Sequence, residues 1–111
     1  MTQTNSQSVE VLVRLFKTIE ARKGADDKSS YTASLLNKGA AHCARKFGEE
    51  AVETIIAGAG EGREALISES ADVIYHLLVL LSAHDVSLDD VCTELSKREG
   101  TSGHDEKAGR G

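Results

Sequence analysis

Apolar residues recur at helical spacing along most of this chain. In the segment 9–19 they fall three or four positions apart with charged residues between them, which predicts an amphipathic helix that ends before Gly24. Residues 1–8 are polar and are expected to form a flexible lead-in. Residues 25–30 are polar as well and predict a loop. The chain therefore begins with one helix between two polar segments.

Three further helices are predicted in the middle of the chain. The first is short, starts at a Ser30 cap and closes at Gly39. A helix over 40–57 and another over 63–83 follow. The segment between these two long helices is rich in glycine, which predicts a short link between antiparallel neighbours. Its glycines are Gly58, Gly60 and Gly62.

The last long helix changes character along its length. It begins with Glu69 and Asp72 on a polar face and is then apolar nearly all round up to Ala83. A helix that is apolar on every side is either central in a fold or shared with a second subunit. Ser87 and Asp90 form a capping box that opens a fifth helix. The pattern therefore predicts an all-α bundle of four to five helices.

The composition fits a single helical domain over residues 9–100. The 111 residues include no Pro and no Trp, and Ala, Leu and Glu dominate. Residues 101–111 are Gly-rich and charged and predict a mobile C-terminal tail. The formal net charge of −5, from 18 acidic and 13 basic residues, gives no general attraction to nucleic acid or to an anionic membrane. We therefore expect neither as a partner.

The cysteines and the apolar stretches indicate a soluble cytoplasmic protein. Cys43 and Cys92 fall within helical patterns and lack paired spacing, so we interpret them as reduced core thiols. The longest apolar stretch, 73–83, is interrupted by polar side chains and is too short to span a bilayer. No secretory signal pattern appears at the N-terminus.

Five acidic residues fall on the two long predicted helices in a pattern that groups them. Residues three or four apart share a helix face, which groups the acids within each helix. Glu53 and Glu69 both lie on the order of 7–10 Å from the glycine link at about 1.5 Å per residue. An antiparallel pair of helices would bring them to one level. The predicted carboxylate cluster consists of Glu49, Glu50, Glu53, Glu69 and Asp72.

Carboxylates in such a cluster repel one another unless a cation lies between them. Hard oxygen ligands suit Mg²⁺ or Mn²⁺ better than Zn²⁺, and Mg²⁺ commonly bridges carboxylates to substrate phosphates. The cluster therefore predicts metal-assisted attack of water at phosphorus. Solvated surface acids explain a single acidic pair better than two matched pairs. A di-iron bundle needs Glu-x-x-His on facing helices, and that tetrad does not occur in the sequence.

His76 lies four residues after Asp72 in the apolar helix. We interpret it as a core histidine with a hydrogen-bond partner, and contact with the carboxylate cluster is the alternative.

Several segments resemble a known family. Glu-Glu-x-x-Glu at 49–53 and, after fifteen residues, Glu-x-x-Asp at 69–72 are similar to the metal motif of the all-α NTP pyrophosphatase superfamily, the MazG-like fold. Its phosphoribosyl-ATP pyrophosphatase branch is resembled more closely, over roughly residues 9–110. The segments concerned are SYTASLLNKG (30–39), KFGEEAVE (46–53), ADVIYHLLVLL (71–81) and the ending 98–110. Phe47 and Ala40, where a small aliphatic residue and a proline are frequent, are minor departures.

The resemblance implies Mg²⁺-dependent hydrolysis of phosphoribosyl-ATP to phosphoribosyl-AMP and pyrophosphate in histidine biosynthesis. It also implies a homodimer that completes the core. By motif match the implied metal ligands are Glu50, Glu53, Glu69 and Asp72. Glu49 is implied either to bind a second metal ion or to orient the attacking water, so Glu49, Glu50 and Glu53 are the candidates for the catalytic step. The candidate substrate-binding cations are Lys38, Arg45, Lys46, Lys107 and Arg110.

Two other functions remain open from the sequence. A house-cleaning hydrolase of free or damaged nucleotides would keep the chemistry and change the substrate, although the tail and the segment around Tyr31 favour the biosynthetic substrate. A helical interaction module whose acids serve only solubility predicts no Mg²⁺-dependent stabilisation and no loss of turnover in Glu53→Gln or Asp72→Asn. The metal chemistry follows from spacing, whereas the substrate rests on the resemblance.

Overall fold

The computed structural model describes residues 6–100, with side chains from Glu10 onward. These residues form helices only, and no strand occurs among them. The predicted all-α fold is confirmed. The elements, in chain order, are α1 (Ser6–Ala21), the 3₁₀ helix η1 (Asp27–Ser29), α2 (Tyr31–Asn37), α3 (Ala40–Gly60), α4 (Arg63–Ala83) and α5 (Leu88–Arg98).

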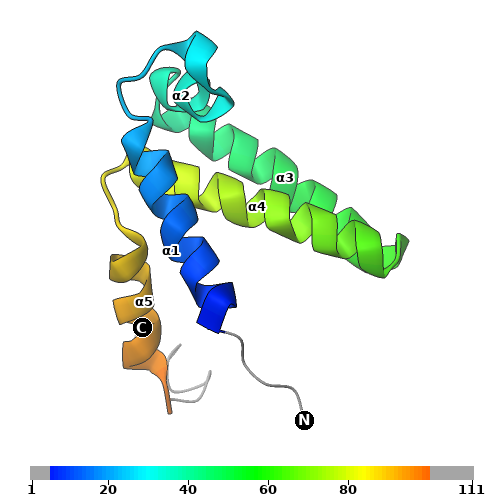
Figure 1. The fold of residues 1–111 in the computed structure, drawn as a ribbon. Helices are drawn as coiled ribbons and strands as arrows, with labels where there is room; N and C mark the ends of the chain where they lie inside the picture. Colours follow the sequence, from blue (N-terminus) through cyan, green and yellow to red (C-terminus); the bar gives the residue numbers. More distant parts are fainter. Residues whose placement is uncertain (1–5, 101–111) are drawn as a thin grey trace.

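The long helices α3 and α4 form an antiparallel hairpin that projects from the rest of the chain (Figure 1). The short helix α2 lies at the base of this hairpin, where α1 packs against the C-terminal half of α4 (Figure 1). Helices α1 and α5 point away from the base as a second arm (Figure 1). The described chain therefore has two arms that meet at one junction.

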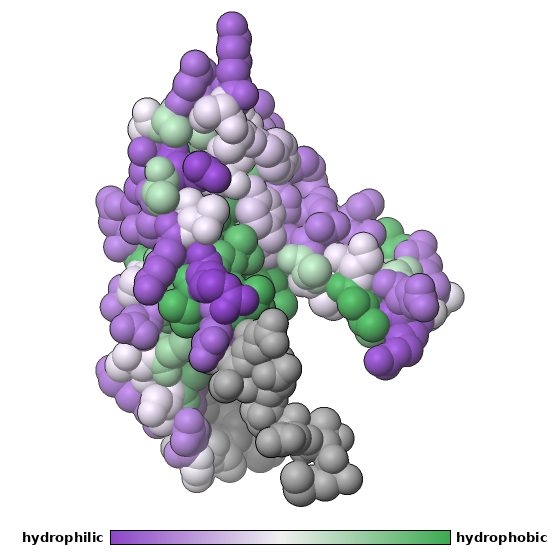
Figure 2. Space-filling model, viewed as in Figure 1, coloured by the Kyte–Doolittle hydropathy of each residue, from purple (hydrophilic) through white to green (hydrophobic). Residues whose placement is uncertain are grey.

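The buried core fills this junction. Its fully buried side chains come from four helices and are each at most 2% exposed: Ile19, Leu35, Cys43, Leu78 and Val79. Apolar residues reach the surface in the angle between the two arms and again toward the tip of the hairpin (Figure 2). On the hairpin Ile55 and Ile67 are 68% and 55% exposed. The described core is thus small, and the hairpin is only partly covered.

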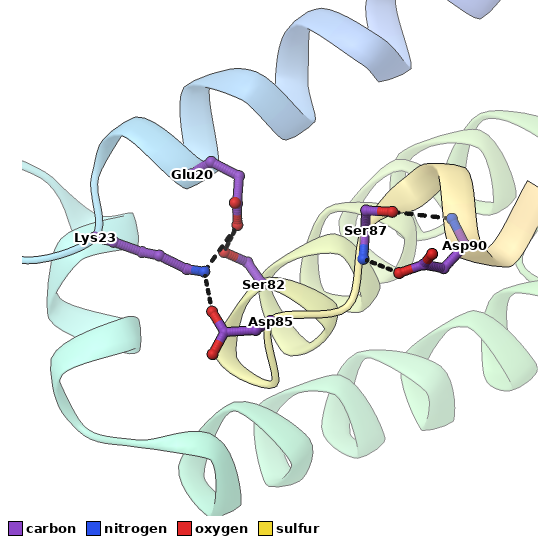
Figure 3. A network of polar contacts seen from close by, with 6 residues as sticks. All are labelled: Glu20, Lys23, Ser82, Asp85, Ser87 and Asp90. Carbon is purple, nitrogen blue, oxygen red and sulfur yellow. Dashed lines mark hydrogen bonds and ion pairs between the residues drawn. The ribbon is translucent and has the colours of Figure 1, made fainter.

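Both predicted helix caps are confirmed. The Ser30 hydroxyl oxygen accepts a hydrogen bond from the Ala33 amide at 2.9 Å, which starts α2. At α5 the Ser87 hydroxyl oxygen accepts from the Asp90 amide, and the Asp90 carboxylate accepts from the Ser87 amide, each at 3.0 Å (Figure 3). These reciprocal bonds satisfy backbone donors that the first turn of a helix leaves unpaired.

The glycine-rich link is shorter than predicted. Helix α3 continues through Gly58 to Gly60, so that only Glu61 and Gly62 connect it to α4. A glycine inside a helix costs about 1 kcal/mol relative to alanine, and the packing of α3 along α4 offsets that cost. The turn depends on Gly62, whose φ of 96° lies in a region that other residues rarely adopt.

Three other expectations differ from the structure. Helix α1 begins at Ser6, inside the segment 1–8 that was expected to be flexible. The loop over 25–30 contains η1, which is capped when the Asp26 carboxylate accepts from the Lys28 amide. Cys43 is buried as expected, but Cys92 is exposed, because the outer face of α5 packs against no other described element.

By length and composition alone, α4 could cross a membrane, and it is the single such helix in the described part of the chain. All 21 residues of α4 together are long enough to cross a bilayer, although the apolar stretch 73–83 alone is too short to do so. Core helices of soluble proteins meet it as well, and α4 packs against both α3 and α1.

Four polar side chains join the ends of α1 and α4 (Figure 3). The buried Ser82 hydroxyl donates to the Glu20 carboxylate. The Lys23 ammonium lies 3.1 Å from Glu20 and 2.7 Å from Asp85. The Ser82 bond lowers the pKa of Glu20, assisted by Lys23. This network fixes α1 on α4 at the edge of the core.

Candidate metal and active site

The register of the hairpin is set by a threonine between its two helices. The Thr54 hydroxyl on α3 lies 2.8 Å from the Glu50 carbonyl oxygen of its own helix and 3.0 Å from the Glu69 carbonyl oxygen of α4. One hydroxyl proton is therefore shared between the two helices. This contact places Glu69 at the level of the acidic turn of α3, as the matched heights in the sequence predict.

Three carboxylates converge at this level. Glu50 from α3 and Glu69 and Asp72 from α4 each place one carboxylate oxygen so that all three lie within 4.8 Å of one another. Glu50 and Glu69 are half-buried, and Asp72 is exposed. A single cation between them could contact all three oxygens. An all-oxygen set of this kind is what Mg²⁺ prefers, with water and substrate phosphate as its other ligands.

The charges of this group act on Glu69. Withdrawal from water raises the pKa of the Glu69 carboxyl, and the negative charges of Glu53, Asp72 and Glu50 raise it further. Because the ionised form of Glu69 is disfavoured without a counter-ion, a divalent cation is electrostatically favoured at this position.

The other two acids of the predicted cluster lie outside the three-residue group. Glu53 is exposed on α3, and its charge raises the pKa of Glu69, so it lies close to the group without one of its oxygens belonging to it. Glu49 is exposed and forms an ion pair with Lys46 at 3.1 Å. The ligand role of Glu53 and the role of Glu49 stay predictions.

The predicted substrate-binding cations are placed unevenly. Lys46 lies one turn from the carboxylate group and is engaged with Glu49. Lys38 and Arg45 are exposed near the N-terminal end of α3. Lys107 and Arg110 lie outside the described residues. Among the five candidate cations, Lys46 is therefore the one that the structure places beside the acidic group.

His76 lies one turn after Asp72 on α4, with two tyrosines around it. Its side chain is 6% exposed, and its Nδ1 has no hydrogen-bond partner among the described residues, so the expected partner of a core histidine is missing at that atom. Burial lowers its pKa, and the charges of Glu50, Asp72 and Lys46 act on it as well. Its ring lies edge-on to those of Tyr31 and Tyr75, with centroid distances of 6.3 and 5.0 Å.

The sequence indicated the carboxylates but not this aromatic cluster. Tyr31 and Tyr75 lie on different helices, and the helical period gives no information on which residues of α2 face α4. The resemblance includes the segments around both Tyr31 and Tyr75, but it does not indicate that the two side chains meet at His76. The signal that could have found the cluster was the placement of both tyrosines within segments that flank the acidic motif.

Known proteins similar to this chain share the same name. The family model described as phosphoribosyl-ATP pyrophosphohydrolase matches residues 12–99. A phosphoribosyl-ATP pyrophosphatase of Cereibacter sphaeroides is 61% identical over 103 residues, which cover 93% of this chain and 100% of that protein. The chain belongs to the phosphoribosyl-ATP pyrophosphohydrolase family. Those of Rhodobacter capsulatus and a Caulobacter species are also 61% identical, over 90% and 95% of this chain and 97% of each relative.

Membership in this family confirms the resemblance stated from the sequence, and with it the predicted class of enzyme, a pyrophosphatase. The family match spans α1 to α5 and contains the three converging carboxylates. The part of the chain that carries the candidate site is therefore the part that defines the family.

Proposed function

We propose that this chain hydrolyses phosphoribosyl-ATP between its α and β phosphates, giving phosphoribosyl-AMP and pyrophosphate, with Mg²⁺ held by Glu50, Glu69 and Asp72. The observation that carries this proposal is the convergence of three carboxylate oxygens from two helices within 4.8 Å. Surface acids that serve only solubility gain nothing from such proximity, because their repulsion raises the free energy of the folded state.

The residues around the group divide the remaining tasks. Glu50, Glu69 and Asp72 would hold the Mg²⁺ ion, which would neutralise charge on the phosphates and make water a better nucleophile. Lys46 offsets negative charge at the phosphates once it leaves Glu49. A water oxygen forms a bond to phosphorus as the anhydride bond breaks, and the leaving phosphate keeps the electron pair. Glu53, as a fourth ligand, and Glu49, as the group that orients the water, are the candidates to take its proton.

A house-cleaning hydrolase of free nucleotides is the alternative with the same fold. The purified protein should be assayed with phosphoribosyl-ATP, ATP, dCTP and dUTP at equal Mg²⁺ concentration, with pyrophosphate release as the readout. We expect kcat/KM for phosphoribosyl-ATP to exceed that for each free nucleotide by at least about 100-fold, roughly 2.7 kcal/mol of transition-state discrimination. Preference for a free nucleotide would exclude the biosynthetic substrate and leave the carboxylate chemistry intact.

The working form is proposed to be a homodimer in the cytoplasm. Helices α3 and α4 expose apolar side chains along the projecting hairpin, which no described element covers. Exposed apolar area of this extent is typical of an interface rather than of a monomer surface. The residues concerned are Val52, Ile55, Ile56, Leu66, Ile67 and Ile74. A second copy that packs along this hairpin would also cover the apolar side of α4, in keeping with a soluble protein.

A further inference from the structure

Tyr31 is the aromatic side chain most open to solvent in this protein. The chain has two tyrosines and two phenylalanines, all within the described residues. Phe16, Phe47 and Tyr75 are half-buried, whereas Tyr31 is 56% exposed. An aromatic ring held in water forgoes the burial that stabilises most such side chains, so its position needs a reason.

The ring is held in place from the side of the core. It meets the imidazole of His76 edge-on at an interplanar angle of 87°. His76 in turn packs edge-on against Tyr75, whose hydroxyl is hydrogen-bonded to Thr32 at 2.5 Å. Thr32 follows Tyr31 directly in α2, so the cluster closes on itself. The ring of Tyr31 thus rests against an imidazole that is itself packed against Tyr75.

The same ring borders the carboxylate site. The ring meets His76, which lies one turn after Asp72 on α4, and Asp72 belongs to the carboxylate group. Lys46, which pairs with Glu49 at 3.1 Å, lies one turn before Glu50 on α3. A ligand with phosphates at the carboxylates therefore has an exposed aromatic ring near it.

A histidine in this place is costly for packing alone. Its buried Nδ1 has no hydrogen-bond partner among the described residues, which destabilises the folded state, whereas a leucine or phenylalanine would fill the space without that loss. A role for Tyr31 as an ordinary surface residue does not explain why such a group supports it. The arrangement fits a ring that must keep its orientation for a planar ligand.

We propose that Tyr31, positioned by His76, is the surface on which the adenine base of the substrate stacks while its phosphates meet the carboxylate group. This inference rests on the proposed function, since it takes the substrate to be an adenine nucleotide. Base–aromatic stacking is worth about 1–3 kcal/mol, so the ring contributes mainly to binding.

Three variants at Tyr31 separate stacking from other roles. Tyr31→Phe keeps the ring, Tyr31→Leu keeps apolar bulk, and Tyr31→Ala removes both. We expect the alanine and leucine variants to raise KM for phosphoribosyl-ATP about 5- to 150-fold, with kcat changed less than about threefold, since stacking of 1–3 kcal/mol acts on binding. The phenylalanine variant should stay near the wild type. Leu95→Ala, a change of an exposed residue on α5, is the control.

Two inhibitors separate the base from the phosphates. AMP carries adenine, whereas inorganic pyrophosphate carries none. We expect Tyr31→Ala to weaken inhibition by AMP about as much as it raises KM and to leave inhibition by pyrophosphate unchanged. Equal weakening of both inhibitors, or an unchanged KM and AMP inhibition, would overturn the proposal.

The role of His76 is tested through the same pair of inhibitors. His76→Leu should fill the buried space and raise KM and the AMP inhibition constant while pyrophosphate inhibition is kept. If His76 had a purely structural role, His76→Leu would change the melting temperature without weakening AMP inhibition more than pyrophosphate inhibition. If the wild-type protein does not turn over phosphoribosyl-ATP, the proposed function fails, but Mg²⁺-dependent binding of AMP to the wild type and to Tyr31→Ala still decides whether the ring stacks on adenine.

Discussion

Glu69 is destabilising in its ionised form when no cation is bound. Its pKa lies above the ordinary value of 4.5, first because of its withdrawal from water and then because of Glu53, Asp72 and Glu50. The folded protein therefore holds this proton more tightly than the unfolded chain, and metal-free stability falls as the pH rises through and above 4.5.

Glu69→Gln is predicted to reverse this effect. Without metal, the variant should melt at a higher temperature than the wild type at pH 7, and the difference should shrink as the pH falls below about 4.5. Mg²⁺ should raise the melting temperature of the wild type and leave that of the variant nearly unchanged. Thermal unfolding with and without Mg²⁺ over pH 4–8 measures both effects. Equal stabilisation of the two proteins by Mg²⁺ contradicts the ligand assignment.

Glu20 is predicted to have the opposite pH dependence. Its pKa is lowered chiefly by the Ser82 hydroxyl and then by Lys23, so its contribution to stability is present above pH 4.5 and is lost as the pH falls through the lowered value. Glu20→Gln should cost about 1 kcal/mol at pH 7, a value reduced for partial exposure, and nothing at low pH. Denaturant unfolding at several pH values checks this.

The control for Glu20 is a carboxylate on the same helix without such a bond. Glu10 forms only an exposed ion pair with Arg14 at 3.8 Å. Glu10→Gln should therefore leave the free energy of unfolding nearly unchanged at every pH. If Glu20→Gln and Glu10→Gln lower the free energy of unfolding equally, the hydrogen bond between Ser82 and Glu20 does not contribute to stability as proposed.

At single residues, the sequence could predict what helical spacing decides. The spacing grouped all five carboxylates, because residues three or four apart share a face and matched distances from a turn share a level. It could not separate Glu50, Glu69 and Asp72 from Glu49 and Glu53, since that depends on which way each side chain points around α3. The placement of Tyr31 over His76 depends on packing between helices and has no periodic signal.

Among the elements, the turn between α3 and α4 is the most sensitive to backbone conformation. Gly62 has a φ of 96°, and an added Cβ would meet no atom within 4 Å, so only backbone strain opposes a side chain there. Gly62→Ala should lower the free energy of unfolding by about 1–2 kcal/mol. The measurement is equilibrium denaturation of the variant beside the wild type.

Gly60 is the matched control for this prediction. It lies two residues earlier as the last residue of α3, has no positive φ, and an added Cβ would also meet no atom within 4 Å. Gly60→Ala should stabilise the protein by about 0.5–1 kcal/mol through helix propensity. If the two variants change stability in the same direction, the turn does not depend on the left-handed conformation of Gly62.

This pair of glycines also shows where the prediction of elements was limited. Helix existence followed from strong periodicity, and the Ser30 and Ser87 caps followed from residue type. The residue at which α3 ends could not be predicted, because each of the three glycines is an equally good place for a helix to end. Contact with α4 decides which of them remain helical. The short η1 helix likewise depends on the Asp26 cap, which the composition of a polar loop does not reveal.

For the whole molecule, the exposed hairpin leads to a prediction about assembly. The described core is confined to the junction, and a charge at the centre of the apolar hairpin face would lie in the proposed dimer interface. Ile55→Glu should convert a homodimer to a monomer, because a buried unpaired carboxylate costs several kcal/mol. Light scattering coupled to size exclusion measures the mass.

Leu95→Glu is the corresponding control, since Leu95 is similarly exposed, at 59%, but lies on α5. It should leave the mass of the particle unchanged. A wild-type protein that is monomeric at micromolar concentration would contradict the proposed assembly, and so would an Ile55→Glu variant that remains dimeric. For the whole molecule, the apolar part of one helix was enough to predict a second subunit from the sequence. How two copies would pack depends on contacts between both chains, and the sequence does not give these contacts.

The central claim is that Glu50, Glu69 and Asp72 hold the metal on which turnover depends. The most direct measurement is pyrophosphate release from phosphoribosyl-ATP by Asp72→Asn across a Mg²⁺ titration, beside Glu64→Gln, which removes a charge from the first turn of α4 outside the group. We predict a loss of at least about 100-fold in kcat/KM for Asp72→Asn, roughly 2.7 kcal/mol, and less than about a twofold change for Glu64→Gln. Wild-type turnover and Mg²⁺ dependence in Asp72→Asn would contradict the account.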